Sequence, residues 1–186
     1  MTEAETYAVE VEGVKRDLRL FEVAPGVRIA ILNILGDTEL VQAAARGLSA
    51  KLKPLHPDVL VTAETKSIPL VHELSAHLGV PYAVLRKHYR SYMGDALEVE
   101  TLSITTGIPQ TLYLDEKDRG LLHGKRVVVV DDVISTGSTL EAMREVVARA
   151  AGETIAEAAI FTEGESAKWA NIVALGHLPV FTDGAP

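Results

Sequence analysis

The sequence predicts an α/β fold in which helices flank a central, mostly parallel sheet. Short apolar runs that suit buried strands alternate along the chain with longer amphipathic segments that suit helices. The clearest run, Val127–Val130, is four valines without a polar interruption. Continuous apolar runs are typical of strands covered on both faces, as in a parallel sheet between helices.

Composition narrows the classes of protein. The chain has 186 residues, 47% of them hydrophobic, no cysteine and a net charge of −8. This length supports one domain with a core, and the lack of cysteine excludes disulfides and thiolate chemistry. The negative charge argues against general nucleic-acid binding. No apolar run suits a membrane span, and residues 1–10 lack the apolar stretch of a signal peptide. We therefore expect a cytoplasmic protein that binds neither nucleic acid nor membranes.

The first third of the chain predicts a hairpin, a further strand and a helix. Thr6–Val11 and Leu18–Val23 both alternate and form the hairpin, and Val27–Leu32 is expected as an edge strand. A helix capped by Asp37 or Thr38 follows and runs to about Lys53.

Val59–Ala63 predicts the first central strand, and a helix follows from Ser67 to Gly79. The loop between them, Glu64–Ser67, is suited to an anion because it opens a helix and contains Lys66. The next strand, Tyr82–Leu85, ends in Arg86 and Lys87, which add positive charge.

Leu97–Leu102 and Thr111–Leu114 predict a polar hairpin, with a turn at Thr105–Pro109. Its position between core strands suits a lid. Later in the chain, Ile155–Thr162 predicts another strand. The short apolar pieces after residue 163 are expected to form a small cap with the N-terminal hairpin.

The segment Val127–Thr139 carries the chemistry. The order is a buried strand, the acids Asp131 and Asp132, a hydroxyl-rich loop with Gly137, and an amphipathic helix. A helix N-terminus has unpaired N–H groups and a positive dipole end, so it binds phosphate. Gly137 lets the backbone curl around the anion, and the acids can accept hydrogen bonds from sugar hydroxyls. The segment therefore suits a ribose 5-phosphate.

This segment resembles the phosphoribosyl-diphosphate (PRPP) signature of the type I phosphoribosyltransferases, and the likeness extends from about Leu32 to Glu163, best with the adenine and xanthine branch. It implies the type I fold as one domain over 1–186. The core would be about 37–162, the hood that roofs the base about 1–36 and 163–186, and the flexible lid about 88–112. The resemblance also implies a homodimer.

The resemblance implies transfer of a 5-phosphoribosyl group from PRPP to a purine, with Mg²⁺ carried mainly by PRPP and no direct protein ligand for the metal. Lys66, Arg86 and Lys87 would meet the leaving pyrophosphate as catalytic residues. Leu32 and Asn33 would meet the base. The residues expected to bind PRPP are Glu64, Thr65, Ser67, Asp131, Asp132, Ser135, Thr136, Gly137, Ser138 and Thr139.

Adenine is the base we predict first. Hypoxanthine-guanine enzymes carry an Asp three positions after the second acid, where this chain has Ser135. Xanthine enzymes carry a Lys where this chain has Gly164, although Asn33 resembles their base-contacting Asn. Adenine enzymes use a lid carboxylate, which Glu98 or Glu100 could supply.

Other functions stay open. The chain could be a xanthine or other nucleobase phosphoribosyltransferase, including a pyrimidine enzyme. It could also be a regulator that senses PRPP without turnover, or a relative of the PRPP synthetases. A regulator of this kind would be expected to have a DNA-binding module, and a synthetase would show two tandem halves.

Overall fold

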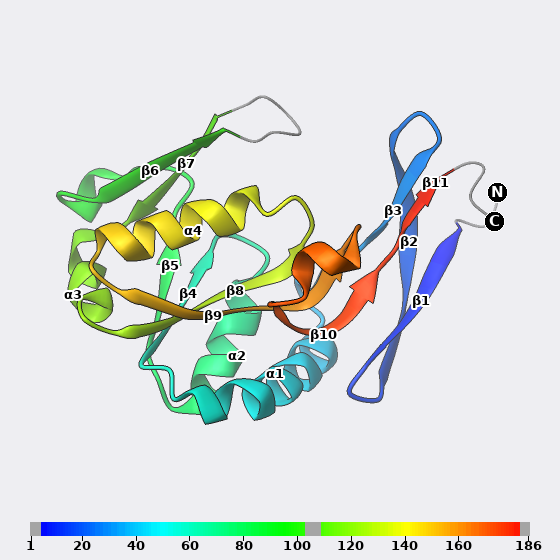
Figure 1. The fold of residues 1–186 in the computed structure, drawn as a ribbon, viewed down its shortest axis with the longest axis horizontal. Helices are drawn as coiled ribbons and strands as arrows, with labels where there is room; N and C mark the ends of the chain where they lie inside the picture. The colour runs from blue at the N-terminus through cyan, green and yellow to red at the C-terminus, as the bar shows by residue number, and fades with distance from the viewer. Residues whose placement is uncertain (1–4, 103–108, 183–186) are drawn as a thin grey trace.

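The computed structural model describes residues 5–102 and 109–182, and it confirms the α/β prediction. Its core is a five-stranded parallel sheet in the order β10-β9-β8-β4-β5. The helices α1 and α2 cover one face of this sheet and α4 covers the other (Figure 1). The core strands are β4 (Val59–Ala63), β5 (Tyr82–Leu85), β8 (Arg126–Ile134), β9 (Glu153–Glu163) and β10 (Val173–Leu178). The α-helices are α1 (Thr38–Leu52), α2 (Ile68–Leu78), α3 (Arg119–Leu122) and α4 (Ser138–Arg149), and the 3-10 helices are η1 (Lys53–Leu55), η2 (Ser91–Met93), η3 (Glu116–Asp118) and η4 (Ser166–Trp169).

The valine run of β8 explains how one strand serves two hydrophobic cores. Successive side chains of a strand point to opposite faces. Val127 and Val129 therefore pack in the cluster that contains α4, while Val128 and Val130 pack in the cluster that contains α1 and α2. All four are fully buried, as expected for a strand covered on both faces.

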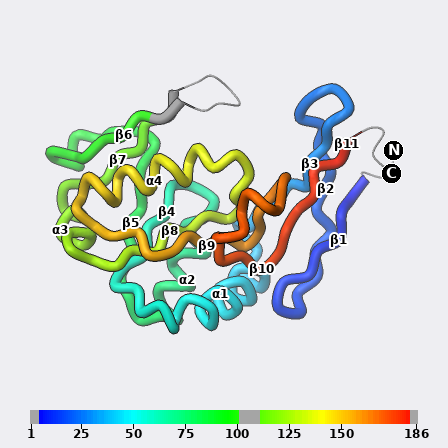
Figure 2. Tube along the Cα trace, viewed as in Figure 1, coloured from blue at the N-terminus to red at the C-terminus, as the bar shows by residue number. Residues whose placement is uncertain are grey.

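The hood is a second, antiparallel sheet at one end of the molecule (Figures 1 and 2). It contains β1 (Thr6–Val11), β2 (Val14–Ala24), β3 (Val27–Ile31) and β11 (Val180–Thr182), in the order β1-β2-β3-β11. The expected edge strand β3 thus lies between two partners, because β11 returns from the C-terminal end to pair with it. The tail is also divided: β10 pairs with β9 in the core sheet, and only β11 joins the hood.

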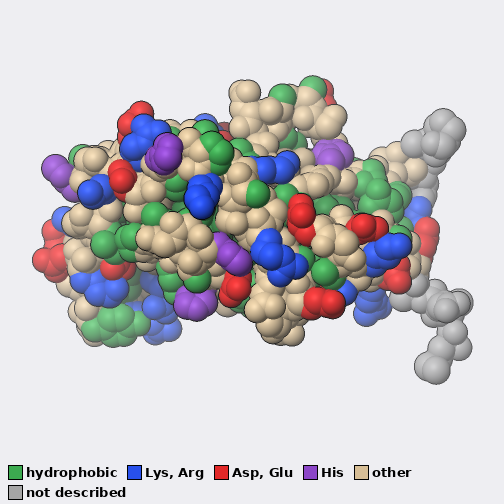
Figure 3. All heavy atoms as spheres, turned by 90° about the horizontal axis from the view of Figure 1, so that it is seen from below, with side chains coloured by type: hydrophobic (Ala, Val, Ile, Leu, Met, Phe, Trp, Pro, Cys, Tyr) green, Lys and Arg blue, Asp and Glu red, His purple; other side chains and the backbone are tan. Residues whose placement is uncertain are grey.

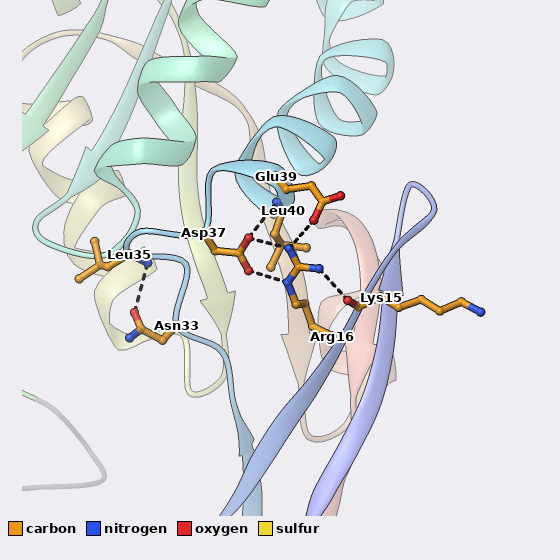
Figure 4. A network of polar contacts seen from close by, with 7 residues as sticks. All are labelled: Lys15, Arg16, Asn33, Leu35, Asp37, Glu39 and Leu40. Atoms are coloured by element: carbon orange, nitrogen blue, oxygen red, sulfur yellow. Dashed lines mark hydrogen bonds and ion pairs between the residues drawn. The ribbon is translucent and has the colours of Figure 1, made fainter.

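One ion-pair network attaches the hood to the core (Figure 4). The Arg16 guanidinium, from β2, donates to both carboxylate oxygens of Asp37, over 2.7 and 2.8 Å, and to Glu39 over 2.8 Å. Asp37 Oδ1 also accepts from Leu40 N at 3.2 Å, which confirms Asp37 as the cap of α1. The start of α1 is therefore bound to the hood through one arginine.

The strands β6 (Leu97–Leu102) and β7 (Pro109–Leu114) form an antiparallel ribbon that packs beside α4. Backbone hydrogen bonds between Arg86 and Tyr113 tie this ribbon to the end of β5. The predicted turn at Thr105–Pro109 lies largely outside the described residues.

No helix within residues 5–102 and 109–182 is long and apolar enough to cross a membrane. On the face seen in Figure 3, acidic and basic side chains are interspersed.

Candidate active site

The predicted motif lies where the core sheet changes its direction of winding. From β4 the chain passes through α2 to β5 on one side, and from β8 it passes through α4 to β9 on the other. β4 pairs with β8 only from Val59 to Val61, so the last residues of β8 project past that neighbour. Ligands of open α/β sheets bind at such a point, beyond the carboxyl ends of the strands.

The two acids lie inside β8, whereas the sequence placed them directly after the strand. Pairing with β9 continues to Ile134, which keeps Asp131 and Asp132 extended. Because strand side chains alternate, each acid also lines a hollow that the other does not reach. Asp131 lines a hollow formed with the Ser135–Leu140 segment, and Asp132 lines one formed with the hood.

Ser67 holds the acid pair together. Its side chain is 2% exposed, and its hydroxyl donates to Asp131 Oδ1 over 2.7 Å. The Ser67 hydroxyl oxygen in turn accepts the Asp132 backbone N–H over 3.0 Å. Ser67 occupies the cap position of α2, as expected, but its side chain makes no cap hydrogen bond. In this structure Ser67 orients the acids, while its predicted contact with PRPP stays a prediction.

The environment of the acids favours a shared proton. Burial, followed by the adjacent charge of Asp132, raises the pKa of Asp131 to about 7, against the opposing effect of the Ser67 hydrogen bond. Two carboxylates this close cannot both ionise freely. The pair therefore changes charge near neutral pH, as is common for groups in functional sites.

The loop after β8 forms the first of three hollows, here called the loop hollow, with a volume of about 40 Å³. Ser135, Thr136, Gly137 and Thr139 line it beside Asp131. Gly137 is the cap residue of α4, with φ at 86°. A left-handed backbone of this kind suits glycine, and the first N–H groups of α4 point outward from the helix end. The loop hollow thus has the chemistry of an anion site.

The second hollow, here called the central hollow, has a volume of about 410 Å³. Thr65, Lys66, Lys87 and both acids line it. Within the described part of the chain, neither lysine ammonium has a hydrogen-bond or ion-pair partner. Their positive charge is therefore available to a bound anion.

Arg86 differs from the two lysines. Its Nε donates to Glu64 Oε2 over 2.6 Å, and the other oxygen of Glu64 accepts the Lys87 backbone N–H over 2.7 Å. Burial alone would raise the pKa of Glu64, but these hydrogen bonds together lower it. The Glu64–Thr65 peptide bond is cis. Glu64, which also lines the central hollow, therefore holds the Lys87 backbone, and Arg86 holds Glu64. The direct roles predicted for Arg86 and Glu64 toward PRPP stay predictions.

The third hollow, here called the hood hollow, has a volume of about 200 Å³ and lies between β3 and the end of β8. Leu32, Lys66, Asp132 and Ser135 line it. Asn33 does not: it is exposed, and its Oδ1 accepts from Leu35 N over 3.2 Å (Figure 4). Only one of the two predicted base contacts thus lies at this hollow in the structure.

Glu163 is a residue of the hood hollow that the sequence did not single out. It ends β9 and is 8% exposed, and burial raises its pKa while His177 opposes the shift. Its carboxyl group makes no hydrogen bond within the described residues. The acids that the sequence favoured, Glu98 and Glu100, instead line a separate hollow with Arg149, the last residue of α4.

The three hollows adjoin one another and share lining residues. Asp131 borders the loop and central hollows, Asp132 borders the central and hood hollows, and Val133 borders all three. No group of three or more His, Cys, Asp or Glu side chains suited to a metal ion occurs within residues 5–102 and 109–182. The carboxylate oxygens of the acid pair are nevertheless hard donors of the kind that Mg²⁺ prefers.

Comparison with known proteins agrees with this geometry. The family model described as a phosphoribosyl transferase domain matches residues 31–174. A hypoxanthine/guanine phosphoribosyltransferase of a Methanocaldococcus species is 36% identical over 111 residues, which cover 60% of this chain and 53% of the relative. The purine biosynthesis transcriptional repressor PurR of Bacillus subtilis is 26% identical over 65% of this chain and 42% of its own length. The chain spans about half the length of the curated relatives it matches.

A solved structure shows the same fold. The adenine phosphoribosyltransferase of Thermoanaerobacter pseudethanolicus superposes with a TM-score of 0.65 at 20% identity, covering 93% of this chain and 95% of that one. The family model extends from the end of the hood strand β3 through the acid pair and the loop to β10, so it includes every element that forms the three hollows except most of β3. From this match we conclude that the chain belongs to the phosphoribosyltransferase family.

Proposed function

We propose that this chain transfers the 5-phosphoribosyl group of PRPP to a purine base and releases pyrophosphate. The observation that carries the proposal is that three adjoining hollows share lining residues around Asp131–Ser135. The loop hollow suits the 5-phosphate, the central hollow suits the ribose and its diphosphate, and the hood hollow suits the base. One substrate spanning the first two hollows would present its C1 atom to the third.

The residues then have distinct roles in the reaction. The amides and hydroxyls of Ser135–Thr139 hold the 5-phosphate. Asp131 and Asp132 accept hydrogen bonds from the ribose hydroxyls, and Ser67 keeps them in register. As the bond to pyrophosphate breaks, positive charge develops at C1 and negative charge on the leaving group, which Lys66 and Lys87 stabilise. Thr65 lines the same hollow.

Arg86 acts one step further from the substrate in this scheme, because its guanidinium bonds to Glu64 and does not line the central hollow. Glu64 lines that hollow and accepts the Lys87 backbone N–H. Mg²⁺ carried by PRPP would screen the diphosphate charge, and the carboxylates of Asp131 and Asp132 would be suitable to hold it. The rest of the catalysis is positioning and fixed charge supplied by the chain itself.

We propose adenine as the base, supported by Glu163. Adenine presents a hydrogen-bond donor beside an acceptor, and a protonated carboxyl group presents the complementary pair. Burial of Glu163 favours that protonated form. An ionised Glu163 would instead accept two N–H groups, as guanine offers, so the relatives named for hypoxanthine and guanine define the alternative. Leu32 lines the same hollow, and a base contact by Asn33 would require its bond to Leu35 to open.

Pyrophosphate release tests the reaction and the base together. The protein is incubated with PRPP, Mg²⁺ and, separately, adenine, hypoxanthine, guanine, xanthine, orotate or uracil. We expect release with adenine. Release with guanine or hypoxanthine alone would contradict the adenine assignment but would still support the proposed phosphoribosyl transfer.

Variants of Glu163 sharpen the base test. Glu163→Gln keeps one donor and one acceptor, so adenine use should persist. Glu163→Leu should raise the KM for adenine by about a hundredfold, because two hydrogen bonds are lost. An unchanged KM in Glu163→Leu would remove Glu163 from base recognition.

The similarity to PurR supports one second candidate, a regulator that binds PRPP without turnover. PRPP binding by calorimetry, with no pyrophosphate release in the presence of any base, would favour the regulator over the enzyme.

The homodimer implied by the resemblance stays a prediction, which the mass in solution by light scattering would test.

A further inference from the structure

The short helix η4, Ser166–Trp169, lies against the loop after β8 although it is about thirty residues later in the chain. The Lys168 ammonium donates to the Thr136 carbonyl over 3.0 Å, and it lies 4.5 Å from the centre of the Trp169 ring. Trp169 is 9% exposed, although η4 is otherwise exposed. The tail thus contacts the loop through one cation and one ring.

The ring closes directly on Gly137. A Cβ atom placed on Gly137 would lie 2.9 Å from the Trp169 side chain, closer than real Cβ contacts allow. The indole N–H donates to the Glu163 carbonyl over 2.9 Å, which fixes the ring to the end of β9. Trp169 therefore connects a residue of the hood hollow to the loop hollow.

The bond from Lys168 also determines how the loop faces a ligand. The C=O and N–H groups of one trans peptide point in opposite directions because the unit is planar. Lys168 binds the Thr136 oxygen from the side of η4. The N–H of Gly137, in the same peptide, is therefore directed away from η4, and it has no partner within the described chain.

We propose that Lys168 and Trp169 are positioning residues that hold the Thr136–Gly137 peptide in the orientation that binds phosphate. The inference rests on the proposed function of the loop. It goes further because it states that two residues of η4 determine the conformation of that loop. Lys168 supplies the charged donor, and Trp169 supplies the surface on which Gly137 rests. Neither residue needs to touch the substrate.

The chain provides its own probe, because Trp169 is the sole tryptophan of the sequence. We would titrate the protein with ribose 5-phosphate and follow tryptophan emission, with calorimetry as the second measurement. The variants are Lys168→Met, Lys168→Arg and a matched control, Lys51→Met. Lys51 is another exposed lysine that donates to a backbone carbonyl, that of Ala174, over 2.9 Å, and it does not line the three hollows.

We expect the emission of the wild type to change on binding. Lys168→Met should bind ribose 5-phosphate about tenfold more weakly and raise the KM for PRPP similarly, with kcat within about twofold, because the contact is lost from ground state and transition state alike. Lys168→Arg keeps a charged donor, so its affinity for ribose 5-phosphate should stay within about threefold of the wild-type value. Lys51→Met should bind ribose 5-phosphate as tightly as the wild type.

The outcomes separate the two proposals. If the wild type does not bind ribose 5-phosphate, the proposed function of the loop is wrong. If the wild type binds and Lys168→Met binds equally well, the positioning role is wrong.

Should Lys168→Met fold poorly, the variant Trp169→Phe replaces it, with binding measured by calorimetry. This variant keeps a ring over Gly137 and loses the indole donor. Weaker binding of ribose 5-phosphate at an unchanged kcat supports the role, and unchanged binding overturns it.

Discussion

Two groups of acids in this molecule have opposite environments. At the junction of hood and core, hydrogen bonds from Arg16 lower the pKa of Asp37. At the end of β8, Asp131 lies beside Asp132, no cation within residues 5–102 and 109–182 bonds to it, and burial raises its pKa. The first arrangement attaches two parts of the fold. The second opposes folding while both acids are ionised, and it leaves acceptors directed at a hollow. The acid that is unfavourable for stability is the one we assign to the ligand.

The largest effect should follow from neutralising the β8 acids. Asp131→Asn combined with Asp132→Asn should weaken PRPP binding by at least about a hundredfold, since two charged acceptors are lost. The unfolding free energy at pH 8 should not fall, because the repulsion between the acids is removed. Isothermal titration and urea unfolding measure the two quantities. Normal PRPP binding by the double variant would show that the acids do not hold the ribose.

The next effect concerns an unpaired cation. Lys87→Ala should lower kcat by about tenfold to a hundredfold, because the leaving group loses a stabilising charge. The melting temperature should stay nearly constant, since the ammonium has no partner within the described residues to lose. Steady-state kinetics and calorimetry test this, and an unchanged kcat would exclude Lys87 from leaving-group stabilisation.

Arg16→Met should lower stability and leave activity nearly unchanged, the reverse of the pattern expected for Lys87→Ala. Removing the guanidinium leaves a half-buried Asp37 without its partner, so the unfolding free energy should fall by about 1–2 kcal/mol. The KM for PRPP should hardly change, because Arg16 does not line the three hollows. A variant that lost PRPP binding but kept its stability would contradict the division between the two acid groups.

The pH dependence of stability should separate the groups further. Asp131 keeps its proton in the folded chain up to about pH 7 and loses it near 3.8 when unfolded, so its contribution to stability falls as pH rises between these values. The pKa of Asp37 is lowered on folding, so its contribution is present above 3.8 and is lost as pH falls below it. Relative to the wild type, Asp131→Asn should gain stability from pH 5 to pH 8. Urea unfolding at both pH values measures this difference, and an equal change in both proteins would contradict the raised pKa of Asp131.

Much of the fold could be predicted from local signals. The uninterrupted valines indicated a strand covered on both faces, and β8 is such a strand. Gly79 ends α2 in the left-handed conformation that its position indicated, and the hairpin of β6 and β7 is present. Each of these features depends on neighbours within a few residues.

The site was less predictable because its contacts join distant segments. Ser67 reaches Asp131 across 64 positions, and the partner of Arg86 is Glu64, 22 positions earlier. Sequence spacing gave no sign that Ser67 would face the acids rather than cap α2, or that Trp169 would rest on Gly137. The likeness to a known family extended from about Leu32 to Glu163, but it assigned no role to Glu163 and ended before Lys168.

The pairing of β4 with β8 has a consequence for how the protein folds. Val61 and Val129 are neighbours in the sheet but are separated by α2, β5 and the β6–β7 ribbon along the chain. Such non-local contacts form slowly, because a long loop must close first. The central hollow, which we assign to the ribose and diphosphate, therefore forms only when this late step is complete. PRPP should slow unfolding, while the early stages of refolding should proceed at the same rate in its presence.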